Sequence, residues 1–198
     1  IMGGTFNPIH YGHLVAAEQA RFKFRLDEVV FVPSGTPPHK VPADLVSSEH
    51  RYLMTVLATS TNPFFNVSRT EIDREGPSYA VDTIRYFLDL YSDRNPKVFF
   101  ITGMDAVMEI LTWRKPETIM ELCTIIAASR PGFEVDRLEN AVGHKNASAV
   151  KRLQASALAI SSTDIRQRIA SGMPIKYLLP ETVEHYIEKN GFYADPPK

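Results

Sequence analysis

Short apolar runs alternate with segments of helical periodicity along almost the whole chain, and this alternation limits the fold more than any other feature. The apolar runs predict buried strands at residues 1–2, 28–32, 64–68, 97–102, 123–128 and 153–159. The periodic segments predict helices at 12–24, 47–59, 79–90, 104–111, 116–122, 163–171 and 181–189. This order favours a parallel sheet, because a crossover between parallel strands usually carries a helix. We therefore expect a doubly wound α/β domain with helices on both faces and ligands beyond the carboxyl ends of the strands.

The composition restricts the class of protein. The chain has 198 residues, with 22 basic and 23 acidic side chains and a formal net charge of −1, so no overall basic field attracts nucleic acid. The one cysteine, Cys123, lies in an apolar run and is predicted to be a buried thiol. No apolar run reaches the ~18 residues of a membrane helix, and no signal peptide is visible. These features predict a cytoplasmic protein. Ile1 reads as the end of a strand, so further residues are expected before it.

The segment from Gly3 to His13 reads GGTFNPIHYGH and links the first predicted strand to the first predicted helix. Backbone N–H groups and the helix dipole favour an anion at such a junction. Paired glycines let a bound group approach the backbone, and the imidazoles of His10 and His13 can donate to oxygens that gain charge in a transition state. The alternatives are a glycine-rich turn with incidental histidines, or half of a metal site. The spacing matches neither G-x-G-x-x-G nor the P-loop.

A second segment, ISSTDIR at residues 160–166, lies at another predicted strand-to-helix junction. Its three hydroxyls stand beside the N–H groups that a helix start leaves without partners. Arg166 follows about one turn later and can present a planar fork to a phosphate. The alternative is a plain helix cap. Because both segments are placed at carboxyl ends of parallel strands, we expect them to meet over one edge of the sheet.

Together, H-x-G-H at 10–13 and I-S-S-T-x-x-R at 160–166 resemble the paired signatures of a nucleotidyltransferase superfamily. Four more stretches are similar to the bacterial nicotinate-mononucleotide adenylyltransferases, in the same order: PPHK at 37–40, SYAVDT at 78–83, GMD at 103–105 followed by Trp113, and SRPG at 129–132. The resemblance runs from Gly3 to about Tyr193. It implies one domain over 1–198, with a Rossmann-like core at 1–159 and the second phosphate motif with C-terminal helices at 160–198. It also implies AMP transfer from ATP to nicotinate mononucleotide in NAD biosynthesis, with Mg²⁺ arriving with ATP.

The resemblance assigns a role to each matching residue. The catalytic residues would be His10, His13 and Arg166, which contact the ATP phosphates. ATP would also be bound by Gly3, Gly4, Thr5, Phe6, Gly103, Asp105, Arg130, Ser161, Ser162 and Thr163. The acceptor and its phosphate would be bound by His39, Lys40, Tyr79, Thr83 and Trp113. No metal ligand is predicted in the protein, because the sequence has no dense carboxylate cluster and Mg²⁺ is commonly held largely by substrate phosphates.

Two departures and several alternatives accompany this assignment. Asn7 stands where many family members carry Asp, and Ala80 replaces a commoner Thr. The same chemistry on nicotinamide mononucleotide or phosphopantetheine is one alternative, and a non-catalytic nucleotide-binding regulator is another. The predicted partners are the two small substrates, with no nucleic acid and no membrane. The sequence leaves open whether the chain forms a homo-oligomer.

Overall fold

The computed structural model describes residues 1–37, 45–129, 149–155 and 159–194. Its strands are β1 (Met2–Gly4), β2 (Val29–Pro33), β3 (Phe65–Val67), β4 (Phe99–Gly103), β5 (Thr124–Ser129) and β6 (Val150–Gln154). Its α-helices are α1 (Tyr11–Phe24), α2 (Ser48–Thr59), α3 (Ala80–Leu90), α4 (Met104–Met108), α5 (Pro116–Leu122), α8 (Ser162–Ala170) and α9 (Glu181–Asn190). Two 3₁₀ turns, η2 (Ser92–Arg94) and η3 (Ile110–Thr112), complete the described elements.

The six strands form one parallel sheet in the order β3-β2-β1-β4-β5-β6. This is the doubly wound order, in which the chain moves outward from β1 in one direction and then returns to continue from β4 in the other. The order therefore reverses between β1 and β4. In such a sheet, ligands bind in the crevice beyond the strand ends at this switch point.

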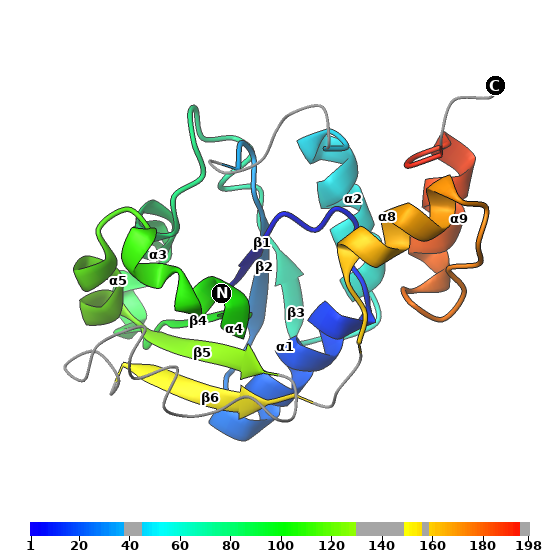
Figure 1. The fold of residues 1–198 in the computed structure, drawn as a ribbon. Coiled ribbons are helices and arrows are strands. Elements are labelled where there is room, and N and C mark those ends of the chain that lie inside the picture. The colour runs from blue at the N-terminus through cyan, green and yellow to red at the C-terminus, as the bar shows by residue number, and fades with distance from the viewer. Residues whose placement is uncertain (38–44, 130–148, 156–158, 195–198) are drawn as a thin grey trace.

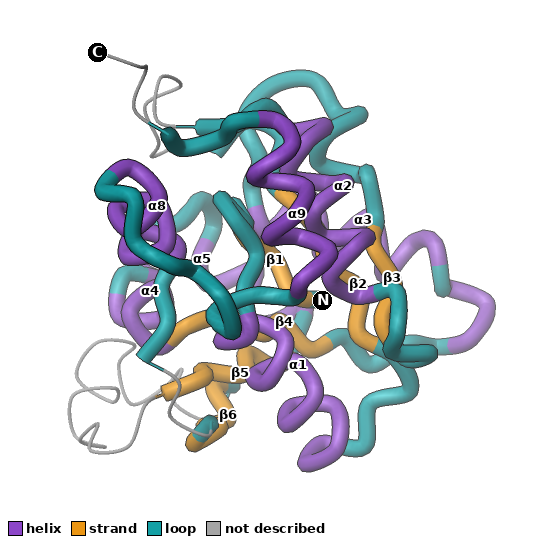
Figure 2. Tube along the Cα trace, turned by 90° about the vertical axis from the view of Figure 1, so that its right-hand side faces the viewer, coloured by secondary structure: helices purple, strands orange, loops and turns teal. Residues whose placement is uncertain are grey.

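The strands are buried on both faces because their apolar residues alternate between two helical layers. In β2, Val29 and Phe31 join one core cluster, whereas Val30 and Val32 join another. The first cluster includes side chains of α1, α2, α8 and α9, and the opposite face is covered by α3, α4 and α5. The ribbon shows these two layers on either side of the sheet (Figure 1). Helix α9 also packs on α2 (Figure 2).

Two predicted elements were wrong in their extent. The last strand was predicted at 153–159 but forms at Val150–Gln154. It lies at the edge of the sheet, where exposed Lys151 and Arg152 are tolerated and obscure the apolar pattern. The helix predicted at 104–111 is divided into α4 and η3, because the backbone leaves the helical region at Glu109 (φ −98°, ψ 5°).

No helix in the parts of the chain that the structure describes has the length and apolar character required to cross a bilayer.

Candidate active site

The two predicted motifs meet beyond the carboxyl end of β1, at the switch point of the sheet. Arg166 of α8 donates through Nη1 to the backbone oxygen of Asn7 at 3.0 Å. Ser162, the first residue of α8, donates through Oγ to the backbone oxygen of Pro8 at 2.9 Å. These bonds join segments more than 150 residues apart in the sequence. They bring the N-terminus of α8 beside the N-terminus of α1, so two helix starts with positive dipole ends lie close together.

The two histidines of the first motif form a stacked pair. Their ring centroids are 3.8 Å apart, with 28° between the ring planes. His10 caps α1, and its backbone N–H donates to Nδ1 of His13 at 3.3 Å. A Cβ atom on Gly12 would lie 3.0 Å from the His10 ring, which explains the glycine between the histidines. The edge-to-face contact of Phe6 with His13, at 5.1 Å, fixes the ring from another side.

The environment of His13 favours its neutral form. Burial and the neighbouring His10 lower the pKa of His13 well below its ordinary value of 6.5. A neutral imidazole carries its proton on one nitrogen, and Nδ1 accepts the His10 N–H. We therefore assign the proton to Nε2. The ring is then a directed hydrogen-bond donor that needs no protonation from solvent.

The glycine-rich start of the first motif is shaped by close packing of aromatic rings. A Cβ atom on Gly3 would lie 2.9 Å from the Phe100 ring, and one on Gly4 would lie 2.8 Å from the Phe6 ring. Phe6 is itself buried, at φ 48°. Its side chain belongs to the core, so any contact with adenosine would come from the backbone of this segment. The backbone oxygen of Thr5 accepts a hydrogen bond from Arg51 at 2.7 Å.

The second motif combines helix capping with phosphate-binding groups. Ser161 is the N-cap of α8 and accepts the Asp164 N–H at 3.1 Å. Thr163 is exposed beside it, and Arg166 is half-buried. The side chain of Ser161 therefore caps the helix, which is the alternative that the sequence left open. Through its bond to the Asn7 oxygen, Arg166 reaches the segment that leads to the histidine pair.

The predicted acceptor residues Tyr79 and Trp113 lie on the opposite face of the sheet, packed against the core beneath α3, α4 and α5. Trp113 contacts Phe100 edge-to-face at 6.0 Å, and Phe100 in turn covers Gly3. Tyr79 is the N-cap of α3, and the guanidinium of Arg114 lies 4.6 Å from its ring centroid. Through Phe100, Trp113 therefore lies next to Gly3 of the first motif, on the face of the sheet opposite α1.

Thr83 differs from the other predicted acceptor residues because its side chain is fully buried. Its hydroxyl donates to Oε1 of Glu71 at 2.5 Å and accepts from Arg74 at 3.2 Å. Thr83 therefore offers no hydroxyl to a ligand in this structure. Its backbone N–H is also used within the helix, on the Tyr79 oxygen at 3.3 Å.

Gly103 is the last residue of β4 and Asp105 follows it, on the far side of the switch point from β1. Both residues are exposed, and a Cβ atom on Gly103 would meet nothing within 4 Å. The backbone is therefore open to a ligand here. Asp105 lies in the first turn of α4.

A family model described as cytidylyltransferase-like matches residues 1–168. A probable nicotinate-nucleotide adenylyltransferase of Thermoanaerobacter sp. (strain X514) is 54% identical over 98% of this chain and 92% of its own length. One of Moorella thermoacetica, under the same name, is 54% identical over 98% of this chain and 90% of its own length.

The chain belongs to the nicotinate-nucleotide adenylyltransferase family. Its fold agrees with that of a solved Plasmodium falciparum nicotinic acid mononucleotide adenylyltransferase complexed with NaAD. The TM-score is 0.79 at 20% identity, covering 97% of this chain and 95% of that one. This likeness bears out the Rossmann-like sheet.

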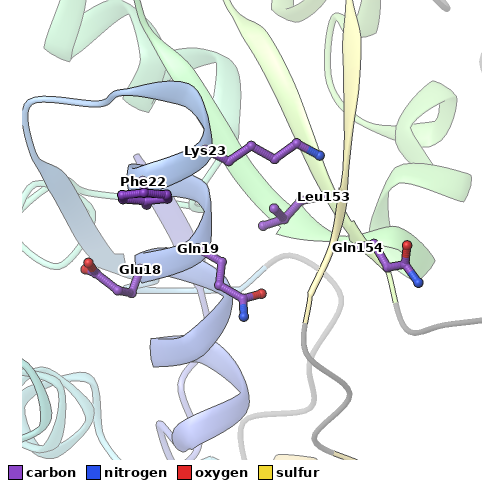
Figure 3. Close-up of a pocket in the computed structure, with 6 residues that line it drawn as sticks. All are labelled: Glu18, Gln19, Phe22, Lys23, Leu153 and Gln154. Atoms are coloured by element: carbon purple, nitrogen blue, oxygen red, sulfur yellow. The ribbon is translucent and has the colours of Figure 1, made fainter.

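Three site residues predicted from the family motifs, His39, Lys40 and Arg130, lie outside the described residues. Two surface hollows are lined by none of the predicted site residues. One, of about 450 Å³, lies between α1 and β6 and is lined by Phe22, Lys23 and Leu153 among others (Figure 3). The other, of about 590 Å³, lies beside α3 and is lined by Arg69, Arg74 and Arg85 among others. Neither hollow adjoins the histidine pair.

Two buried charged residues of this family member were not predicted from the sequence. Arg51 of α2 is 1% exposed and donates to the backbone oxygens of Val46, Thr5 and Gly35 at 2.9, 2.7 and 3.2 Å. Burial lowers the pKa of its guanidinium, which nevertheless remains a cation. Glu71 is 7% exposed, and burial raises its pKa, opposed chiefly by the hydrogen bond from Thr83. Helical spacing from Arg51 to buried Met54 and Ala58 was the signal that could have revealed the arginine.

Proposed function

We propose that the protein transfers AMP from ATP to the phosphate of nicotinate mononucleotide, giving nicotinate adenine dinucleotide and pyrophosphate. The observation that carries this proposal is the hydrogen-bonded junction of the two motifs, from Arg166 to Asn7 and from Ser162 to Pro8. It assembles a stacked histidine pair, an arginine and two helix starts at one point. Full-length relatives at 54% identity with this activity in their names support the acceptor.

The reaction is an in-line displacement at the α-phosphorus of ATP. An oxygen of the mononucleotide phosphate forms the new P–O bond, the bond to the bridging α–β oxygen breaks, and pyrophosphate leaves with that electron pair. No covalent enzyme intermediate is required, so the protein contributes position and charge stabilisation. Neutral His13 donates from Nε2 to a phosphate oxygen, with His10 beside it. Arg166, Ser162 and Thr163 hold the leaving β- and γ-phosphates.

The remaining predicted residues are assigned to the two nucleosides. The backbone of residues 3–6 and the open backbone at Gly103 would face adenosine, and Asp105 would accept a hydrogen bond from a ribose hydroxyl. Trp113 and Tyr79 would flank the pyridine ring, with the α3 helix start directed to its carboxylate. His39 and Lys40 would approach the acceptor phosphate, and Arg130 the ATP.

Mg²⁺ enters this reaction with ATP as part of the substrate. The described part of the chain contains no group of three or more His, Cys, Asp or Glu side chains arranged to hold a metal. Asn7, at the position where many family members carry Asp, accepts hydrogen bonds through Oδ1 from the Val46 N–H at 3.3 Å and the Tyr193 hydroxyl at 2.8 Å. An amide engaged in this way suits a metal held by phosphates rather than by this side chain. Held by the ATP phosphates, Mg²⁺ would neutralise part of their negative charge.

A cytoplasmic location accompanies this proposal, since both substrates are metabolites of the cell interior and the one cysteine is a buried free thiol.

The test is pyrophosphate release by the purified protein with Mg²⁺-ATP, offered nicotinate mononucleotide, nicotinamide mononucleotide and phosphopantetheine in parallel. We expect kcat/KM for the nicotinate compound to exceed the other two by at least ~10-fold, the scale on which one unmatched polar group is rejected. Faster turnover of another acceptor would keep the phosphate chemistry and overturn the acceptor. ATP binding without turnover of any acceptor would favour a regulatory nucleotide-binding protein.

A further inference from the structure

We propose that Glu71 is a positioning residue: its buried carboxylate holds the start of α3 and the segment after β2 in place against the loop after β1, and so sets the affinity for the acceptor. The inference rests on the proposed function. It names a residue outside both motifs that would act through its neighbours rather than by touching either substrate.

The carboxylate of Glu71 lies beside two hydroxyls from the region where α3 begins, those of Thr83 and Ser78. Thr83 donates to Oε1 at 2.5 Å, and the nearby Ser78 hydroxyl helps to lower the pKa of the carboxyl against the effect of burial. Arg74 approaches the same cluster through its bond to Thr83. Since Glu71 is 7% exposed, these partners replace the water that its carboxylate loses on burial. Residues just before α3 and in its first turn are thus fixed to one buried group.

Ser78 extends this connection to the segment after β2. Its Oγ accepts the N–H groups of Gly35 and Thr36 at 3.0 and 3.3 Å, and its own N–H donates to the Thr36 oxygen at 2.9 Å. Both acceptor positions of this hydroxyl are therefore occupied, and its one donor position remains for the nearby Glu71 carboxylate. A Cβ atom on Gly35 would overlap the backbone oxygen of Glu71, so the two segments are also in direct contact.

The peptide group between Gly35 and Thr36 joins Glu71 to the phosphate side of the site. Its N–H donates to Ser78, and its carbonyl accepts from Arg51 at 3.2 Å. Arg51 in turn donates to the Thr5 oxygen at 2.7 Å. The Arg51 cation lies at the carbonyl end of this peptide group, and the Glu71 carboxylate lies behind Ser78 at the N–H end. Both charges polarise the peptide in the same direction, which strengthens its hydrogen bonds to Arg51 and Ser78. The chain of contacts therefore runs from α3 to the loop that leads to the histidines.

The proposed acceptor and phosphate sites lie on separate segments of the chain, so this connection affects how the two substrates are placed relative to each other. Tyr79 lies directly after Ser78 and is on the proposed acceptor side, whereas Thr5 precedes the histidine pair by five and eight residues in the sequence. A shift of about 1 Å between reacting groups costs as much as ~10²-fold in rate. Loss of the Glu71 charge would relax the acceptor half, while the contacts of α1 with α8 stay in place.

The experiment compares Glu71→Gln with wild type by steady-state kinetics, by the Kd of a non-hydrolysable ATP analogue, and by Tm. Gln keeps the size but presents an N–H₂ group to hydroxyls that donate. We expect KM for nicotinate mononucleotide to rise about 10-fold and kcat to fall less, with the analogue Kd within about twofold. Glu49→Gln is the matched control, because this exposed carboxylate binds Arg69 on the protein surface. It should leave all three readouts unchanged.

A second pair of variants separates positioning from folding. Thr83→Val removes the hydroxyl that donates to Glu71 with little change of volume, and Thr83→Ser retains it. Positioning predicts that Val reproduces the rise in KM and that Ser reverses most of it. An unchanged KM in Glu71→Gln, or an equal rise in the analogue Kd, would overturn the inference. Wild-type protein that turns over no acceptor would overturn the proposed function and, with it, this inference.

Discussion

Removal of the His13 ring should reduce turnover far more than it reduces ATP binding. In the structure the Nδ1 atom accepts the His10 N–H, so Nε2 is left as the donor for a phosphate oxygen. Loss of one preorganised donor of this kind costs about 2.7–4 kcal/mol in the transition state, or ~10²–10³ in kcat. His13→Ala also loses ring contacts with His10 and Phe6, each worth roughly 0.5–1.5 kcal/mol of stability. The protein should therefore stay folded while kcat falls.

A second substitution at the same position tests the cause of this fall. His13→Gln places an amide N–H near the position of Nε2 and should recover about tenfold or more of the lost kcat. His185→Ala is the control, since His185 is exposed on α9. The assay is initial-rate pyrophosphate release at saturating substrates, with Tm measured alongside. Near-normal kcat in His13→Ala, or a fall in kcat matched by an equal loss of ATP-analogue affinity, would refute the role of Nε2 as a transition-state donor.

Three further predictions concern stability and reactivity. Gly35→Ala should destabilise the protein by about 2 kcal/mol and lower Tm by roughly 4–8 °C, because the new Cβ atom overlaps the Glu71 backbone oxygen. Gly103→Ala is the control and should leave Tm unchanged, because there is open space around the new Cβ atom. The pKa of His13 is lower in the folded protein than in the unfolded chain, so the unfolded chain binds more protons below about pH 6.5. The stability contributed by neutral His13 is therefore full above that pH and is lost as the pH falls. Urea unfolding midpoints should show this loss, and His13→Gln should reduce the pH dependence of the midpoint. Burial raises the pKa of the Cys123 thiol to about 12, so a thiol reagent should modify it only on unfolding, and rapid labelling of the native protein would contradict the structure.

The features predictable from the sequence are those with a local physical cause. The doubly wound sheet followed from apolar runs, since a strand buried on both faces has no polar alternation to obscure it. The hydroxyl run at residues 161–163 favoured a helix start, and Ser161 is the cap of α8, since it accepts the Asp164 N–H. The edge strand β6 was placed too late, because Lys151 and Arg152 give it the composition of a loop. Cys123 is buried as predicted.

The features that escaped prediction depend on contacts between distant segments. By residue type, Arg51 looks like an ordinary surface residue of α2, yet it binds carbonyls from three separate segments. The family resemblance predicted that Thr83 binds the acceptor, but its hydroxyl donates to Glu71 inside the protein. The close packing around Gly3 involves the ring of Phe100, which is distant in the sequence. Helical spacing indicates that Arg51 is buried, but the partners of Arg51, Thr83 and Gly3 are set by tertiary packing.

The most direct test of the proposed chemistry follows the oxygens of the acceptor phosphate. Nicotinate mononucleotide labelled with ¹⁸O in its non-bridging phosphate oxygens is incubated with unlabelled Mg²⁺-ATP, and the products are analysed by mass spectrometry. Attack of this phosphate on the α-phosphorus of ATP predicts a dinucleotide that retains every labelled oxygen and pyrophosphate that carries none. Label in the pyrophosphate, or release of pyrophosphate without a labelled dinucleotide, would contradict the adenylyl transfer proposed for this site.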